Sequence, residues 1–218
     1  MKKGVIFDLD GTTLYTLTDI TTSFNAALKE FGFPQKSEDE IRMGVGMGFR
    51  ILVDNIVPKD TDEKKKDAIA LRYKEIYSSN YYINTRPYEG MRETLEKLRD
   101  LGVKMAVNSN KSDIFVKDLI ARNFPGIEFV DVTGSIEGVA LKPDPQAARM
   151  ILNKMGIDAS EAAYIGDSDI DMKTGVNAGM LTIGCLWGYR DEKVLKEAGA
   201  MCLAEKPEDI LKLIKEEQ

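Results

Sequence analysis

The sequence predicts an α/β fold, a doubly wound, Rossmann-like parallel sheet into which an α-helical domain is inserted. The second half of the chain alternates short apolar runs with longer segments of helical periodicity, as strands joined by crossover helices do. A separate apolar run, Val5 to Phe7, lies near the N-terminus, whereas residues 17–82 show helical patterns and no convincing strand. We therefore expect a core domain of residues 1–14 and 84–218 and a helical cap domain of residues 15–83.

The inserted segment contains four helical patterns, at residues 19–33, 37–43, 48–57 and 61–82. Gly32 is a plausible stop for the first helix. Ser37 followed three residues later by Glu40 is the signature of a capping box at the start of the second. The last helix is expected to be capped by Thr61 or Asp62, whose side-chain oxygens can accept a hydrogen bond from a free backbone N–H.

The core elements are predicted from the strand and helix periodicities of the apolar residues. Strands are expected at residues 5–8, 103–109, 128–134, 161–168 and 180–187, and helices at residues 90–102, 111–124, 144–156, 169–179, 191–200 and 207–217. The N-terminal strand belongs to this sheet, so the helical block is an insertion that follows it.

The chain is acidic and otherwise has the composition of an ordinary globular protein. Its 218 residues include 30 lysines and arginines against 36 aspartates and glutamates, a net charge of −6. The lysines at 64–66 are flanked by acidic residues and suit a solvated helix face, not a nucleic-acid surface. No apolar run reaches the roughly 18 residues of a membrane span, and the N-terminus lacks a signal-peptide core. We expect a cytoplasmic protein, monomer or homodimer, that binds neither nucleic acid nor membrane.

Histidine is absent, and this narrows the chemistry. The absence excludes Ser-His-Asp and Cys-His nucleophiles, the H-E-x-x-H zinc site and every imidazole acid or base. Cys185 and Cys202 form no C-x-x-C motif and lie in apolar contexts, so structural burial is expected for both. An enzyme of this composition must use carboxylates, lysines, hydroxyls or a hard metal ion.

Polar clusters follow three of the predicted strands. Asp8 and Asp10 come at the end of the first, Asn-Ser-Asn-Lys at 108–111 ends the second, and Gly-Asp-Ser-Asp at 166–169 ends a third. Ligands of open α/β sheets bind at the carboxyl ends of the strands. The three clusters are therefore expected to meet in one site, and two of them are strongly acidic.

Four short motifs resemble those of the haloacid dehalogenase-like hydrolase superfamily and occur in its order. They are FDLDGTT at residues 7–13, VNSNK at 107–111, LKPDP at 141–145 and YIGDSDID at 164–171. The helical block also lies where this superfamily inserts an α-helical cap. The similarity spans essentially the whole chain and is greatest to the phosphoglycolate phosphatase-like branch.

The resemblance implies roles for the two carboxylates of the first motif. Asp8 would be the nucleophile that attacks phosphorus and forms an aspartyl-phosphate, which a carboxylate can do once the phosphoryl charge is screened. Asp10 would protonate the leaving oxygen and then activate water, because an acid or base must be a group separate from the nucleophile. The family's dehalogenases lack this second aspartate.

The resemblance also implies a Mg²⁺ site. Asp167 would bind the ion together with the carboxylate of Asp8 and the backbone carbonyl of Asp10, and Asp171 would orient these groups or a metal-bound water. An all-oxygen ligand set suits Mg²⁺, which would reduce the repulsion between the anionic nucleophile and the anionic phosphate.

Phosphate binding falls, by the same resemblance, to three residues. Ser109 and the backbone amide of Asn110 would donate hydrogen bonds to the phosphoryl oxygens, and Lys142 would place a positive charge beside the phosphate and Asp8. Lys111 stays open between a cation at the rim of the site and a surface residue at the start of a helix.

The cap contains the sequence GVGMGFR at residues 44–50, where related caps have a specificity loop facing the active site. Gly46 and Arg50 are therefore candidate specificity residues, and Arg50 could bind a carboxylate of the substrate or equally occupy a surface helix position. Thr13 and Tyr15 depart from the family pattern of Leu and an acidic residue. This departure affects the prediction of substrate class, not of the chemistry.

Together these observations predict a Mg²⁺-dependent phosphatase that hydrolyses a small phosphorylated metabolite through an aspartyl-phosphate, with phosphoglycolate as the leading substrate and sugar phosphates as others. A phosphomutase resembling β-phosphoglucomutase remains an alternative, because it would share every core residue. A non-catalytic regulatory protein that binds a phosphate ligand is a third alternative, against which the complete set of site residues argues.

Overall fold

The computed structural model describes residues 1–215, and the last two residues of the helix expected at 207–217 lie outside that range. Within it the chain forms two compact units, one of residues 1–14 and the described residues from 87 onward, and the other of residues 15–86. No described helix is long and apolar enough to cross a membrane. The expected division into a core domain and a cap domain stays a prediction.

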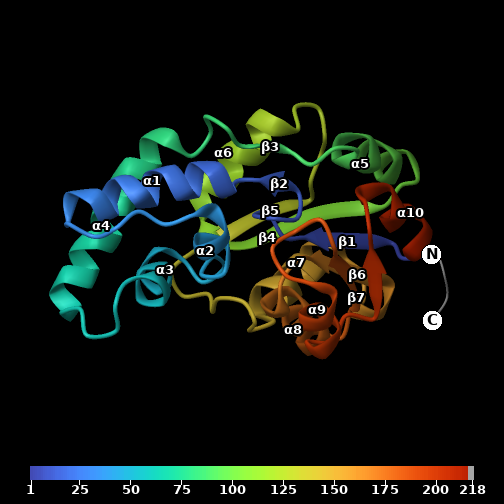
Figure 1. Ribbon diagram of the computed structural model, residues 1–218. Helices are drawn as coiled ribbons and strands as arrows, with labels where there is room; N and C mark the ends of the chain where they lie inside the picture. The colour runs from blue at the N-terminus through green and yellow to red at the C-terminus, as the bar shows by residue number, and fades with distance from the viewer. Residues whose placement is uncertain (216–218) are drawn as a thin grey trace. The chain divides into compact units, whose positions relative to one another are not determined.

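The first unit contains a six-stranded parallel sheet, which confirms the predicted fold class (Figure 1). Its strand order is β5-β4-β1-β6-β7-β8. The strands are β1 (Gly4–Phe7), β4 (Lys104–Ser112), β5 (Asp131–Ser135), β6 (Ala162–Gly166), β7 (Leu181–Cys185) and β8 (Cys202–Ala204). The three-residue β8 was not predicted, since a segment so short shows no measurable period.

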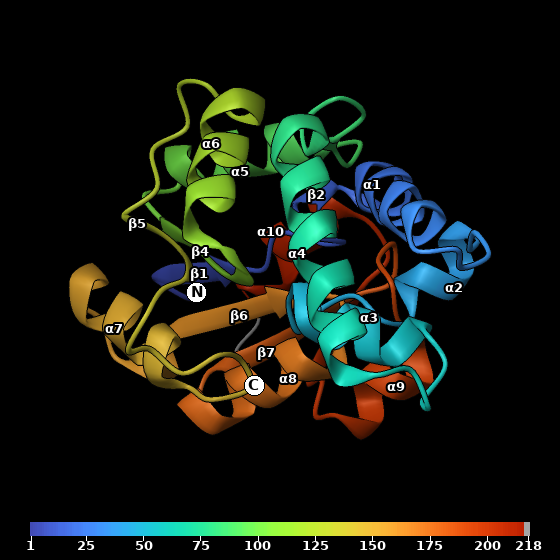
Figure 2. The same ribbon diagram turned by 90° about the vertical axis from the view of Figure 1, so that its left-hand side faces the viewer.

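Helices cover both faces of this sheet, as in a doubly wound fold. Figure 2 shows α5 and α6 on one side of the strands and α7 and α8 on the other. The helices of this unit are α5 (Met91–Asp100), α6 (Asp113–Asn123), α7 (Gln146–Met155), α8 (Asp169–Ala178), α9 (Glu192–Glu197) and α10 (Ile210–Leu213), with 3₁₀ turns η1 (Ala159–Glu161) and η2 (Pro207–Asp209).

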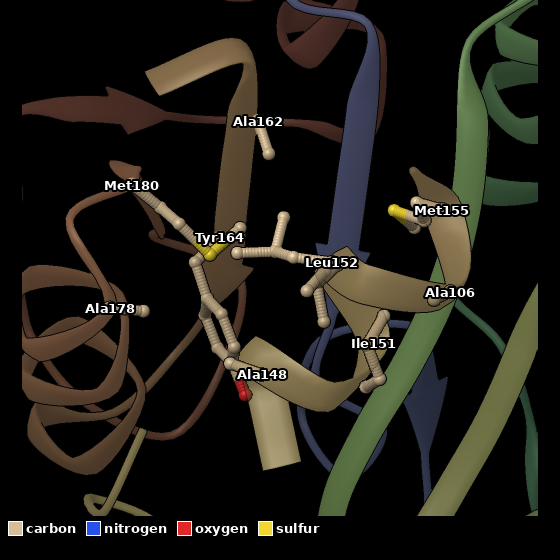
Figure 3. Close-up of a cluster of buried hydrophobic side chains, with 10 residues drawn as sticks. Ala106, Ala148, Ile151, Leu152, Met155, Ala162, Tyr164, Ala178 and Met180 are labelled. Atoms are coloured by element: carbon tan, nitrogen blue, oxygen red, sulfur yellow. The ribbon is translucent and has the colours of Figure 1, made fainter. Parts of the chain in front are cut away.

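An apolar cluster joins α7 to the sheet beneath it. Ile151 and Leu152 of α7 lie against Ala106 of β4 and Tyr164 of β6, and all four are at least 95% buried (Figure 3). Burying an isoleucine or leucine side chain of this kind stabilises the fold by about 1.5–3 kcal/mol. Of the two free cysteines, Cys185 is buried as expected, whereas Cys202 is only half-buried because it lies in the edge strand β8.

The second unit is helical and comprises α1 (Leu17–Glu30), α2 (Glu38–Arg42), α3 (Phe49–Ile56) and α4 (Glu63–Asn80). The capping box of Ser37 and Glu40 is present, and Asp62, not Thr61, caps α4. Its core includes an edge-to-face pair between Phe24 and Tyr73, with ring centroids 5.2 Å apart. The short strands β2 (Leu14–Tyr15) and β3 (Arg86–Pro87) pair where the chain passes between the units.

Candidate active site

The site is built on three adjacent strands of the sheet. β1 lies between β4 and β6, and its last residue, Phe7, is opposite Val107 and Ile165. Because all three strands are parallel, the next residues along each strand emerge at the same edge. These residues are Asp8 on β1, Asn108 and then Ser109 on β4, and Gly166 and then Asp167 on β6.

Lys142 forms a buried ion pair with two of the carboxylates. Its Nζ donates hydrogen bonds to Oδ1 of Asp8 and to Oδ1 of Asp171, both at 2.7 Å, and its side chain is 4% exposed. Burial alone would lower the pKa of Lys142, but Asp171 and Asp8 raise it well above its usual value. The ammonium group is therefore fixed beside Asp8 as a permanent positive charge.

Asn110 positions Lys142 through its side chain. The Asn110 Oδ1 accepts from the backbone N–H of Lys142 at 2.8 Å, and its Nδ2 donates to the Lys142 carbonyl at 3.1 Å. This two-point contact ties the Lys142 loop to the end of β4. The sequence suggested only the backbone amide of Asn110 as a phosphate donor, and that role stays a prediction.

Asp167 is held by two further contacts that sequence reasoning missed. The Thr12 hydroxyl donates to its Oδ1 at 3.0 Å, and the backbone N–H of Tyr189 donates to its Oδ2 at 2.7 Å. Tyr189 follows β7, so a fourth strand end contributes to the site. The Trp-Gly-Tyr sequence after that strand was the available signal, but a backbone donor has no residue type by which to recognise it.

Two glycines allow the chain to approach Asp167 closely. A Cβ at Gly188 would lie 2.1 Å from Asp167 Cβ, and one at Gly11 would lie 2.3 Å from Asp167 Oδ2. Gly11 also has a φ of +88°, a conformation that other residues rarely adopt. Both positions therefore require glycine, and any side chain there would displace the Asp167 carboxylate.

Three buried carboxylates converge in this site. Ligand oxygens of Asp8, Asp167 and Asp171 all lie within 4.8 Å of one another. Burial raises the pKa of Asp8, and so do Asp171 and Asp167, against the opposing effect of Lys142. Burial and Asp171 likewise raise the pKa of Asp167 to about 7. Three carboxylates thus share the single ammonium of Lys142, and a hard divalent cation fits this oxygen donor set.

Asp10 points to a different partner. Both of its carboxylate oxygens accept hydrogen bonds from Lys111 Nζ, at 2.8 and 2.9 Å, and its side chain is not part of the three-carboxylate cluster. Ser109 is buried beside this pair, and its Oγ accepts from the backbone N–H of Lys111 at 3.2 Å. The site therefore separates the nucleophile candidate from the acid or base candidate by giving each its own lysine.

The family model for haloacid dehalogenase-like hydrolases matches residues 5–185 of this sequence. The chain belongs to this family. The match includes Asp8, Ser109, Lys142 and Asp167 and the whole helical unit, and it confirms the family resemblance seen in the sequence.

Related proteins support the same class of enzyme. The chain is 31% identical over 215 residues to a phosphoglycolate phosphatase of Aquifex aeolicus, covering 96% of this chain and 95% of that protein. A candidate phosphoglycolate phosphatase of Lactobacillus delbrueckii subsp. bulgaricus has a crystal structure with a TM-score of 0.92 at 29% identity, covering 98% and 99% of the two chains. These similarities confirm the predicted enzyme class, a phosphoric monoester hydrolase of the haloacid dehalogenase-like family.

A structural match to a phosphomutase is weaker. A candidate beta-phosphoglucomutase of Bacteroides vulgatus has a TM-score of 0.79 at 25% identity, covering 98% of this chain and 88% of that one. The mutase alternative therefore has less support than phosphatase activity. The match also shows that this fold occurs in a protein described as a mutase.

The two predicted specificity residues lie in the helical unit. Arg50 binds three carboxylates there: its Nε donates to Asp67 at 2.7 Å, and its terminal nitrogens contact Asp54 and Glu63. Gly46 lies in the preceding loop with a φ of +131°. Arg50 is thus already paired with three carboxylates of its own unit. The specificity role of both residues stays a prediction.

Proposed function

We propose that this protein is a Mg²⁺-dependent phosphatase that hydrolyses a small phosphate monoester through an aspartyl-phosphate on Asp8. The observation that carries the proposal is the buried ion pair of Asp8 with Lys142, 2.7 Å long, inside a cluster of three carboxylates. A nucleophile for phosphorus needs this combination, because a free carboxylate would be repelled by the phosphoryl oxygens.

In the first half of the reaction, an oxygen of Asp8 would attack phosphorus while the bond from phosphorus to the leaving oxygen breaks. Lys142 and Ser109 would stabilise the charge that develops on the phosphoryl oxygens. Asp10 would supply the proton that the leaving oxygen needs. The products of this half are the alcohol and a phosphorylated Asp8.

In the second half, a water molecule would attack the phosphorus of the aspartyl-phosphate. Asp10 would accept the proton of that water as the bond to Asp8 breaks, which restores the Asp8 carboxylate and releases phosphate. Separate placement of Asp10 on Lys111, away from the Lys142 cluster, supports this division of roles.

Mg²⁺ would be held by the carboxylates of Asp8 and Asp167 and by the backbone carbonyl of Asp10, with Asp171 orienting them. When bound, the ion supplies positive charge that offsets the repulsion between nucleophile and phosphate. The oxygen donors within 4.8 Å support a divalent cation here, because three carboxylates lie together with only the ammonium of Lys142 beside them.

Phosphoglycolate is the leading substrate, because the Aquifex aeolicus relative of nearly equal length is named a phosphoglycolate phosphatase. A screen of phosphorylated metabolites with Mg²⁺, which measures released phosphate, tests the proposal. We expect phosphoglycolate to rank first, chelation of the metal to abolish release, and Asp8→Asn to abolish it as well.

The same screen includes two contradicting outcomes. Unchanged phosphate release by Asp8→Asn would overturn the nucleophile assignment. Conversion of a sugar phosphate to its isomer without phosphate release would overturn the hydrolase in favour of a mutase.

A further inference from the structure

Lys111 is a second lysine at the sheet edge whose side chain is largely covered, and its partner is not a member of the acidic cluster. Its Nζ lies 2.8 and 2.9 Å from the two carboxylate oxygens of Asp10. The two side chains are only 7% and 13% exposed. The sequence left Lys111 between a rim cation and a surface residue, and neither describes a part-buried two-point contact with the proposed acid and base.

Two neighbours restrict where the Lys111 side chain can lie. Its backbone N–H donates to Ser109 Oγ at 3.2 Å, within β4. The helix α6 begins two residues later at Asp113, whose Oδ1 accepts from the backbone N–H of Gly134 on β5. Lys111 thus lies near the end of β4, where this strand pairs with β5 and α6 begins.

We propose that Lys111 is a positioning residue that holds the Asp10 carboxylate for the water-activating half of the reaction; this role rests on the function proposed above. Both Asp10 oxygens accept from one ammonium, and these two charge-assisted hydrogen bonds hold the carboxylate at the end of β4. Each oxygen keeps a second lone pair, so one of them can still accept a proton from water.

The step that Lys111 supports is the hydrolysis of phosphorylated Asp8. Water oxygen bonds to phosphorus, the bond from phosphorus to Asp8 breaks, and the proton of the water passes to an Asp10 oxygen. A carboxylate that turns away from the water would slow this step, and misplacement by about 1 Å costs on the order of 10²-fold in rate. Formation of phosphorylated Asp8 from an ester whose leaving group needs no proton does not require that orientation.

The test compares wild type with Lys111→Met and uses 4-nitrophenyl phosphate with Mg²⁺, since nitrophenolate leaves without a proton. Rapid mixing measures the nitrophenolate burst, and acid quenching measures the fraction of phosphorylated Asp8 at steady state. For Lys111→Met we expect a burst of one nitrophenolate per enzyme, accumulation of phosphorylated Asp8, and a steady-state rate lower by on the order of 10²-fold. Lys111→Arg, which keeps the charge, should recover much of the rate.

Lys117→Met is the matched control. This lysine of α6 also pairs with a carboxylate, that of Asp113 at 2.6 Å, but its side chain is 60% exposed. Its removal should leave the burst, the steady-state rate and the phosphorylated fraction unchanged.

Three results would overturn the inference. They are an equal loss of burst and steady-state rate in a folded Lys111→Met protein, a raised KM without accumulation of phosphorylated Asp8, and no change at all. Failure of the proposed function is distinct, because wild type would then release no phosphate from any monoester, or Asp8→Asn would remain active.

Discussion

The two units each contain a cation bound by several carboxylates, but the two clusters differ in burial. In the core, Lys142 is 4% exposed and its partner Asp171 is fully buried. In the helical unit, Arg50 is 32% exposed and its partners Glu63 and Asp67 are 69% and 70% exposed. Water screens the second cluster and scarcely reaches the first. The difference shows how similar charged groups form a buried cluster in one unit and a surface network in the other.

The comparison predicts its largest effect at Lys142. Lys142→Met leaves three buried carboxylates without a cation, and removal of one partner from a buried ion pair costs about 3–5 kcal/mol. We expect a large loss of stability in urea unfolding and loss of phosphate release. Lys154→Met is the control, because Lys154 pairs with Asp131 at 2.7 Å but is 53% exposed. A loss as great in the control would contradict the role of burial.

The next largest loss of stability is expected on substitution of Asp19, which tests whether burial also strengthens contacts within the helical unit. Its carboxylate is 2% exposed and accepts from both the backbone and the side chain of Asn84 and of Thr85, at 2.8–3.0 Å. Asp19→Ala should lower the free energy of unfolding by about 2 kcal/mol, because buried contacts to the carboxylate are lost. Asp19→Asn, which keeps an acceptor, should lose less. Equal losses would show that hydrogen bonding is not the cause.

Substitution of Asp167 is expected to change the stability by a smaller amount, and this change depends on pH. Its pKa is raised from 3.8 to about 7, so the metal-free protein loses stability as pH rises from about 4 through about 7. Asp167→Asn does not lose stability in this way, because asparagine does not ionise. Without metal its Tm should exceed that of wild type by a few degrees at pH 8 and by less at pH 5.

Addition of Mg²⁺ gives the second arm of this test. The ion should raise the Tm of wild type by binding the folded state, and it should raise the Tm of Asp167→Asn much less. A gap in Tm that does not depend on pH, or an equal response of both proteins to Mg²⁺, would contradict the assigned site.

Arg50 is expected to give the smallest effect on stability. Arg50→Gln breaks only screened contacts, so its Tm should change by no more than about 2 °C. The KM for phosphoglycolate then distinguishes the two interpretations of Arg50, a substrate contact and a surface residue. A raised KM would support contact with the substrate carboxylate, whereas an unchanged KM would leave Arg50 as a surface residue of the helical unit.

The fold class was predictable because it depends on periodicity, which the alternation after Arg86 displays over many residues. The convergence of Asp8, Lys142 and Asp167 also followed from the order of the motifs and the direction of parallel strands. Contacts made by backbone groups were not predictable. The Tyr189 N–H on Asp167 depends on where a loop passes, and no residue type encodes that position.

The contacts of side chains that could bind more than one partner were not predictable either. Asn110 binds the backbone of Lys142 at both ends of its amide, although the sequence suggested only a role for its main chain. From the sequence alone, Lys111 could equally have pointed to solvent. In the fold it lies near the end of β4 and binds Asp10. Such choices depend on distances between segments that lie about a hundred residues or fewer apart in sequence but meet only in the folded sheet.

We expect Asp8 to become phosphorylated during turnover. The direct measurement is acid quenching of the enzyme during reaction with phosphoglycolate and Mg²⁺, followed by peptide mapping by mass spectrometry. We predict a phosphoryl group on Asp8 that is absent from Asp8→Asn and disappears when substrate is exhausted. Turnover at full rate with no phosphoryl group on Asp8, or with one on another residue, would contradict the account.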